Sequence, residues 1–351
     1  MKKFIVSTFF VVFQSCLCLT QSYGFTLGYQ KHIDFFNFID NLSNWSPGFT
    51  SSRYQIFWES EGLQQPNDLK HLESIRKIRN KYFHPKPSIF IHYDESEDPI
   101  AEAFYNAPNL QSAINKLEEI LPKTDAKELI SALIYFEPKV RKYTNDNTII
   151  RNALNDILQR KDINDFYKKV SIFYNCKIVT PNKLKIHAVS LPPNKNISAF
   201  ILNNTIIVSL PTSATQINEK MLAEFSSIIA HELMHFHSMN TPKKIQIEHE
   251  KSLIQLVHYD LKNQENYNLL IEEPLAVILG QKIFMKKFFP KHYNVYENVY
   301  SDPWVRIMSF LLEPLVAAYI EQTLPIDYKF IEAYASLSNQ VINAHKSLAK
   351  N

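Results

Sequence analysis

Glycine is scarce in this chain: there are 5 in 351 residues, and none lies between residues 63 and 279. Loops that cradle phosphate groups need several glycines close together, because only glycine lets the backbone approach the phosphate oxygens so closely. The chain has no such cluster. It also lacks the Gly-x-Ser-x-Gly turn that carries the nucleophile of many serine hydrolases. The sequence therefore gives no support for a dinucleotide site, a P-loop or a nucleophile elbow.

Cysteine is also rare, and two of the three residues, Cys16 and Cys18, lie close to the N-terminus. If that segment is removed, Cys176 is the only thiol and no internal disulfide can form, which excludes a disulfide scaffold. Cys176 follows the sequence Ile-Phe-Tyr-Asn at residues 172–175. This mostly apolar setting indicates a packed, inert thiol rather than a catalytic one.

The N-terminus has the pattern of a secretory signal peptide over residues 1–22. Two lysines precede an apolar stretch from Phe4 to Phe13, and small residues suit cleavage after Ser22. Lipid attachment at Cys16 is an alternative, although the residues before it match a lipobox poorly. Cleavage would remove two lysines and no acidic residue, lowering the formal charge from +3 to +1. We therefore expect an exported protein, periplasmic or secreted, and see no reason to expect nucleic acid or an anionic membrane as a partner.

Residues 231–235 read His-Glu-Leu-Met-His, which is the HExxH pattern. On a helix, His231 and His235 lie about 40° apart on one face, so both imidazoles can bind one zinc ion. Glu232 sits beside them, and we predict that it acts as general base toward a water molecule that the zinc activates. The apolar spacing from Asn218 to Phe236 predicts that the motif lies on a buried helix.

Three short β-rich runs precede this helix. They cover residues Leu184–Leu191, Ile197–Leu202 and Thr205–Leu210. Asn203 and Asn204 separate the last two runs, and asparagine tolerates the left-handed backbone that a tight hairpin needs. We therefore predict a hairpin directly before the HExxH helix, with an edge strand to which an extended peptide could pair.

A catalytic zinc ion usually needs a third protein ligand. Downstream, residues 272–276 read Glu-Glu-Pro-Leu-Ala, and the proline suits the first turn of a helix. Here the chain resembles the gluzincin metallopeptidases, which pair a HExxH helix with a glutamate on a second helix, often with a small residue three positions later. Ala276 stands in that place relative to Glu273. The resemblance therefore implies Glu273 as the third ligand.

Other residues could supply the third ligand instead. The neighbouring Glu272 is one candidate. Glu313 is another, because it begins a second Glu-Pro-Leu sequence inside the apolar run Ile307–Ile320. His237 lies about 200° around the helix from His235, so we expect it beside the site rather than on the metal.

The rest of the chain is dominated by helical patterns. We expect an α+β, predominantly helical fold, with a zincin-like catalytic region and a small antiparallel sheet or hairpin before the HExxH helix. Residues 23–180 are predicted to form a mainly helical region that makes one wall of the cleft, and residues 181–351 to form the catalytic region with C-terminal helices. The apolar run at 307–320 contains a glutamate and is too short for a membrane span, so we expect a core helix there.

These features predict an exported zinc metallopeptidase that hydrolyses peptide or protein substrates, with Zn²⁺ as its cofactor. One alternative is a non-catalytic exported binding protein with a structural or vestigial zinc site, and another is a chance HExxH sequence in a helical structural protein. Glu232 favours the enzyme, because a binding protein has no need of a base there. The sequence does not choose among several candidates for stabilising the oxyanion: His249, His258, Tyr259, Tyr267, His292 and Tyr293.

Overall fold

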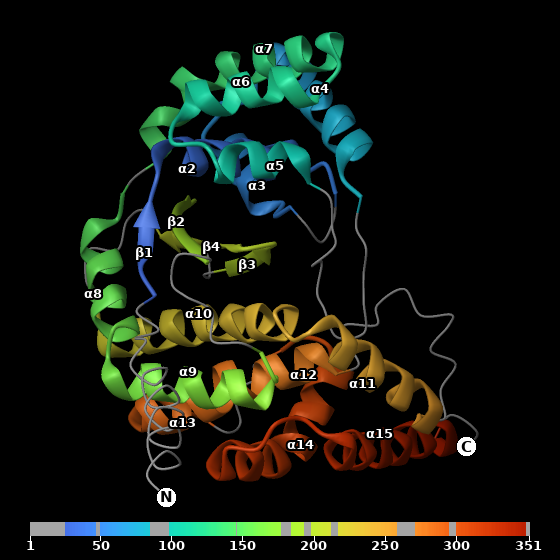
Figure 1. Ribbon diagram of the computed structural model, residues 1–351. Coiled ribbons are helices and arrows are strands. Elements are labelled where there is room, and N and C mark those ends of the chain that lie inside the picture. Colours follow the sequence, from blue (N-terminus) through green and yellow to red (C-terminus); the bar gives the residue numbers. More distant parts are fainter. Residues whose placement is uncertain are drawn as a thin grey trace, which may run out of the picture.

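The computed structural model describes residues 25–46, 50–84, 98–144, 146–176, 184–192, 198–211, 217–257, 271–294 and 300–348. Within these residues, helices form an upper and a lower layer, with a small sheet between them (Figure 1). The predicted α+β, predominantly helical fold class is therefore confirmed. The predicted signal peptide lies outside the described residues.

The upper layer is built from helices in the first half of the chain. They are α2 (Lys31–Ser43), α3 (Arg53–Ser60), α4 (Pro66–Tyr82), α5 (Pro99–Tyr105), α6 (Leu110–Ile120) and α7 (Lys123–Val140). Aromatic side chains fill the space between them, and the rings of Phe36 and Phe104 stack with centroids 4.1 Å apart. Because large buried aromatics contribute much apolar area, this layer has a hydrophobic core of its own.

The sheet has four strands in the order β1-β2-β4-β3. They are β1 (Leu27–Tyr29), β2 (Lys185–Leu191), β3 (Ser198–Leu202) and β4 (Thr205–Pro211). The predicted hairpin is confirmed: β3 and β4 pair antiparallel, and Asn203 adopts φ 51° in the turn. The prediction of an antiparallel sheet holds only for this hairpin. The four-stranded sheet is mixed, because β1 pairs with β2 and β2 with β4 in parallel. Parallel pairs need long crossover connections, and here the helices of the upper layer separate β1 from β2.

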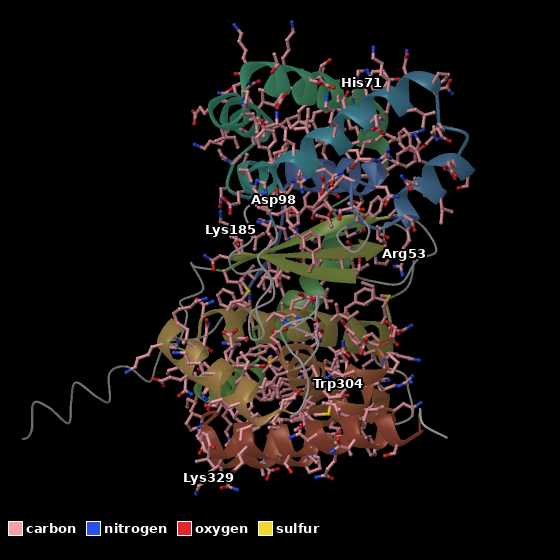
Figure 2. All side chains as sticks on the ribbon, turned by 90° about the vertical axis from the view of Figure 1, so that its right-hand side faces the viewer. Arg53, His71, Asp98, Lys185, Trp304 and Lys329 are labelled. Carbon is pink, nitrogen blue, oxygen red and sulfur yellow. The ribbon has the colours of Figure 1, made fainter. Side chains whose placement is uncertain are left out.

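Alternate residues of the central strands face the two layers, as the period of a strand requires. In β4, Ile206 and Val208 belong to the lower core, whereas Ile207 belongs to the upper core. In β2, Ile186 belongs to the lower core and Val189 to the upper core. Figure 2 shows the sheet between two layers of packed side chains, with His71 in the upper layer and Trp304 in the lower one.

The upper layer is tied to the sheet by buried polar contacts as well as by packing. The carboxylate of Asp34 on α2 accepts hydrogen bonds from the backbone N–H and the hydroxyl of Ser190, at 2.6 and 2.7 Å. The Tyr54 hydroxyl on α3 donates to the Ser190 carbonyl at 3.0 Å. These bonds satisfy polar groups that would otherwise be costly to bury, and they fix β2 against the upper layer.

The lower layer contains the HExxH helix and the C-terminal half of the chain. Its elements are α8 (Thr148–Leu158), α9 (Lys161–Phe173), α10 (Glu219–Met239), α11 (Lys243–Leu256), α12 (Glu272–Ala276), η6 (Val277–Ile283), α13 (Phe284–Phe288), η7 (Pro290–His292), α14 (Pro303–Gln322) and α15 (Tyr328–Leu348). Helices α8 and α9 pack into this lower core, although they come from residues before 180. The division of the chain at residue 180 stays a prediction.

Helix α10 begins where the sequence predicts. Asn218 is its N-cap, and the Asn218 side chain accepts a hydrogen bond from the Met221 N–H. This bond satisfies one of the free amides of the first turn. Helix α10 then runs beneath the sheet for 21 residues, and Ile229, Leu233 and Phe236 are fully buried along it. The HExxH motif therefore lies on a helix that is largely buried.

Helix α14 has two different faces. Its length and hydropathy are sufficient for a helix that crosses a membrane, and 33% of its apolar window is buried inside the protein. Met308, Leu312 and Val316 belong to the lower core, whereas Phe310 is 63% exposed. Helix α14 therefore contributes to the core with one face only. The absence of a membrane span stays a prediction.

Candidate metal centre

The two histidines of the HExxH motif point at each other across one turn of α10. Their Nε2 atoms lie 3.0 Å apart, and their side chains are almost completely buried. Residues four apart on a helix lie on the same face, which is why His231 and His235 can meet in this way. The motif therefore presents two imidazole nitrogens to one point.

Glu273 brings a carboxylate to the same point from a second element. One carboxylate oxygen, Oε2, lies 3.5 Å from His231 Nε2, and the other, Oε1, lies 3.6 Å from His235 Nε2. Glu273 sits in the first turn of α12, which packs directly against α10. The structure thus brings together the three residues that the sequence proposed as ligands.

The separation of these three groups suits a zinc ion. A tetrahedral zinc ion with ligand bonds of about 2.0–2.1 Å needs its donor atoms about 3.3 Å apart. The two Nε2 atoms lie 3.0 Å apart, and each lies 3.5 or 3.6 Å from a different carboxylate oxygen of Glu273, which is close to that value. Two imidazoles and one carboxylate, with a fourth position for water, are also a donor set typical of catalytic zinc. The buried histidines and glutamates could therefore hold a metal ion, and zinc is one ion that such donors suit.

Glu232 lies next to the same point but is not one of the three converging donors. Its carboxylate and the nitrogens of His231 and His235 all lie within 4.8 Å of one another. Burial raises the pKa of the Glu232 carboxyl, and the nearby charges of His235 and His231 only partly offset this effect. A carboxylate with a raised pKa is a better proton acceptor near neutral pH than an ordinary surface glutamate.

Glu272 contacts the other end of the His235 ring. Its Oε1 accepts a hydrogen bond from His235 Nδ1, which faces away from His231 and Glu273. Burial alone would lower the pKa of His235, but the charges of Glu272 and Glu273 raise it to about 10. Glu272 was an alternative third ligand on sequence grounds. Its carboxylate contacts Nδ1 of His235, and the ligand atoms of His235, Glu272 and Glu273 also lie within 4.8 Å of one another, as a second group that could hold a metal ion.

Glu313 and His237 lie apart from the convergence point. Glu313 on α14 forms ion pairs with Lys286 and, at 3.8 Å, with Lys282. His237 is fully buried on another face of α10, where its Nδ1 lies 3.3 Å from Cys176 Sγ. Burial lowers the pKa of His237 to about 3 and raises that of Cys176 to about 12, so both groups are neutral near pH 7. The pair therefore lacks the thiolate that a cysteine nucleophile needs.

The helix that follows Glu273 changes from α to π geometry over η6 before it returns to α geometry in α13. Its π segment carries Gly280, which lies directly against α10. A Cβ at residue 280 would come within 2.8 Å of the Ala230 carbonyl carbon and still closer to the backbone of His231. Glycine is therefore required where the two ligand-bearing helices touch.

Tyr300 is a residue of this site that the sequence did not reveal. Its ring stacks with that of His231, with centroids 6.5 Å apart and an interplanar angle of 23°. The Tyr300 side chain also hydrogen-bonds Glu273, and burial followed by the Glu273 charge raises the pKa of Tyr300. No spacing rule links residue 300 to residue 231, so only the folded chain shows this contact.

Three of the residues proposed earlier for stabilising the oxyanion lie within the described part of the chain. His292 lies 3.3 Å from Glu219, and Tyr293 lies beside the Lys286 ammonium group. His249 belongs to α11. The remaining three candidates, His258, Tyr259 and Tyr267, lie outside the described residues.

Comparison with known proteins adds no relative to this description. No protein-family model, curated protein or solved structure shows significant similarity to the chain. The resemblance to gluzincins therefore rests on the motif residues of the sequence alone.

Proposed function

We propose that this chain is a zinc-dependent metallopeptidase, with His231, His235 and Glu273 as metal ligands and Glu232 as general base. The observation that supports this most is the convergence of three donors, from two helices, at separations of 3.0 to 3.6 Å. A buried group of this kind is expensive to maintain without a cation, because its carboxylates are removed from water. The zincin-like catalytic region that the sequence predicts, with the HExxH helix of the lower layer in it, belongs to the same proposal.

The chemistry follows from the groups around the convergence point. A zinc ion bound there would lower the pKa of a water molecule and polarise a substrate carbonyl. Glu232 would accept the proton as the water oxygen bonds to the carbonyl carbon. When the C–N bond breaks, Glu232 would deliver that proton to the leaving amine nitrogen. Water, substrate and products then balance without any other reactant.

The sheet offers a place for an extended substrate. Strand β3 is an edge strand that packs against α10, and Phe200 on it is 36% exposed. An edge strand can pair with a peptide through backbone hydrogen bonds, which suits recognition of polypeptide rather than of a small ester. Tyr300, beside Glu273 and His231, is the residue best placed among those described to donate a hydrogen bond to the developing oxyanion.

The proposed setting is outside the cytoplasm. It rests on the signal-peptide pattern over residues 1–22 and on the expected single remaining thiol, Cys176. Zinc peptidases with buried ligands need no disulfide for this chemistry, so a disulfide-free exported domain is compatible with the proposal.

The proposal is tested by removing and restoring the metal. Purified protein is assayed on a mixture of unstructured peptides by mass spectrometry, then stripped with a chelator and reloaded with zinc. We expect cleavage that disappears on stripping and returns with zinc, together with about one zinc per chain. Bound zinc without any cleavage would instead support the non-catalytic binding protein. Failure to bind zinc would support a chance HExxH sequence.

A further inference from the structure

Two adjacent glutamates at the start of α12 occupy opposite ends of one imidazole ring. Glu273 faces Nε2 of His235 at 3.6 Å, whereas Glu272 is hydrogen-bonded to Nδ1 of the same ring. Successive residues of a helix point about 100° apart, so neighbouring carboxylates can lie on either side of a ring that enters between them. The first turn of α12 thus holds His235 from both ends.

Burying the Glu272 carboxylate is energetically unfavourable unless its contacts compensate for the lost hydration. Its side chain is only 1% exposed. Its second oxygen, Oε2, has no hydrogen-bond partner among the described residues, so the contact with His235 is the one described bond that satisfies this carboxylate. Removing a carboxylate from water is costly, and the ion pair or hydrogen bond with His235 must offset that cost.

The two histidines differ in this respect. Nδ1 of His231 is also buried, but it has no hydrogen-bond partner among the residues that the structure describes. Its ring is flanked by Tyr300 instead. The carboxylate support is therefore specific to His235, and it is not a general consequence of burying a histidine on α10.

We propose that Glu272 is a positioning residue that acts through His235 and is not itself a metal ligand. By accepting a hydrogen bond from Nδ1–H, Glu272 favours the neutral tautomer of His235 in which the Nε2 lone pair faces Glu273 and His231. It also fixes the ring plane and increases the electron density that Nε2 can donate to a cation. This inference rests on the metal site of the proposed function, and its consequences appear in metal binding itself.

The test measures zinc affinity, by competition with a chromogenic chelator, in the full chain and in four variants. Glu272→Gln keeps an oxygen that can accept the hydrogen bond but removes its charge, and Glu272→Ala removes both. Glu273→Ala serves as the ligand-loss reference. Glu313→Gln is the matched control, because Glu313 also precedes a Pro-Leu pair but pairs with lysine away from the site.

We expect Glu272→Ala to weaken zinc affinity by about 10- to 100-fold and Glu272→Gln by less, the range typical of residues that orient a metal ligand. Glu273→Ala should weaken affinity much more, and Glu313→Gln should leave it unchanged. Cobalt(II) is a second probe, since its visible spectrum reports ligand geometry. We expect the Glu272→Gln spectrum to show an altered coordination sphere at full cobalt occupancy.

Two results would overturn the inference. Unchanged zinc affinity and cobalt spectra in both Glu272 variants would show that the contact is only structural, even if the metal-free proteins melt at lower temperature. A loss of zinc in Glu272→Gln as complete as in Glu273→Ala would make Glu272 a ligand. If Glu272→Ala does not fold, Glu272→Gln carries the test. Neither reading depends on peptide cleavage, so a protein that binds zinc without hydrolysis would refute the proposed function alone.

Discussion

Gly280 touches the backbone of His231, and this contact sets how closely the helix bearing Glu273 approaches the helix bearing the two histidines. Any side chain at residue 280 would overlap backbone atoms of α10, which have no rotamer by which to move aside. The spacing of the metal ligands therefore depends on a residue that carries no side chain.

Replacing Gly280 tests this dependence. We expect Gly280→Ala to lower the free energy of unfolding by about 1–3 kcal/mol, the usual cost of overpacking, and to weaken zinc binding as α12 moves away from α10. Urea unfolding and chelator competition measure the two effects. Gly28→Ala is the control, because a Cβ there would meet its neighbours at 3.6 Å, an ordinary contact. Equal behaviour of the two variants would contradict the close-approach explanation.

The identity of the third ligand can be settled by exchange of single carboxylates. Glu273→Gln should bind zinc far more weakly than the natural chain, since it loses the charge that faces both Nε2 atoms. Glu313→Gln should retain a full equivalent of zinc by elemental analysis. If Glu313→Gln loses its metal and Glu273→Gln keeps it, the proposed ligand set is wrong.

Tyr300 should affect catalysis more than metal binding. Loss of one hydrogen-bond donor to an oxyanion typically lowers kcat by about 100- to 1,000-fold. We therefore expect Tyr300→Phe to keep its zinc and much of its KM but to lose most of its kcat on peptides. The phenyl ring can still stack on His231, so folding should be little changed. A kcat equal to that of the natural chain would remove Tyr300 from the mechanism.

His187 in β2 should make the fold sensitive to acid. Burial, then the charges of Lys185 and His32, lower its pKa to about 4, and neither ring nitrogen has a hydrogen-bond partner among the described residues. The unfolded histidine has a pKa near 6.5, so its unfolded form takes up a proton first as the pH falls. The stability tied to the neutral ring is complete above pH 6.5 and is lost from there down to about pH 4.

This acid sensitivity has a direct measurement. The slope of the unfolding free energy between those pH values should fall by up to about 1.4 kcal/mol per pH unit in His187→Phe relative to the natural chain. An unaltered slope in His187→Phe would show that another group titrates on folding.

Local features of this protein were readable from its sequence. The start of α10 at the Asn218 cap depends on residues within one helical turn, and the hairpin turn at Asn203 depends on the backbone preference of asparagine. The juxtaposition of His231 and His235 likewise follows from helix geometry alone. In each case the determining residues lie within a few positions of one another.

Long-range features were not readable. Strand β1 pairs in parallel with a strand about 160 residues later in the chain. Its three residues are too few for an alternating apolar pattern to predict a strand. Glu272 and Glu273 are chemically identical neighbours, so only the direction from which His235 enters distinguishes their contacts. Tyr300 reaches the site through tertiary packing, which leaves no periodic signal.

The central claim is that Glu232 transfers protons in a metal-dependent hydrolysis, and one comparison tests it most directly. The natural chain and Glu232→Gln are each loaded to equal zinc content and incubated with the same peptide mixture, and new termini are counted by mass spectrometry. We expect equal zinc binding, with cleavage by the variant slower by about 100- to 10,000-fold. Equal cleavage rates in the two zinc-loaded proteins would contradict the mechanism proposed for this site.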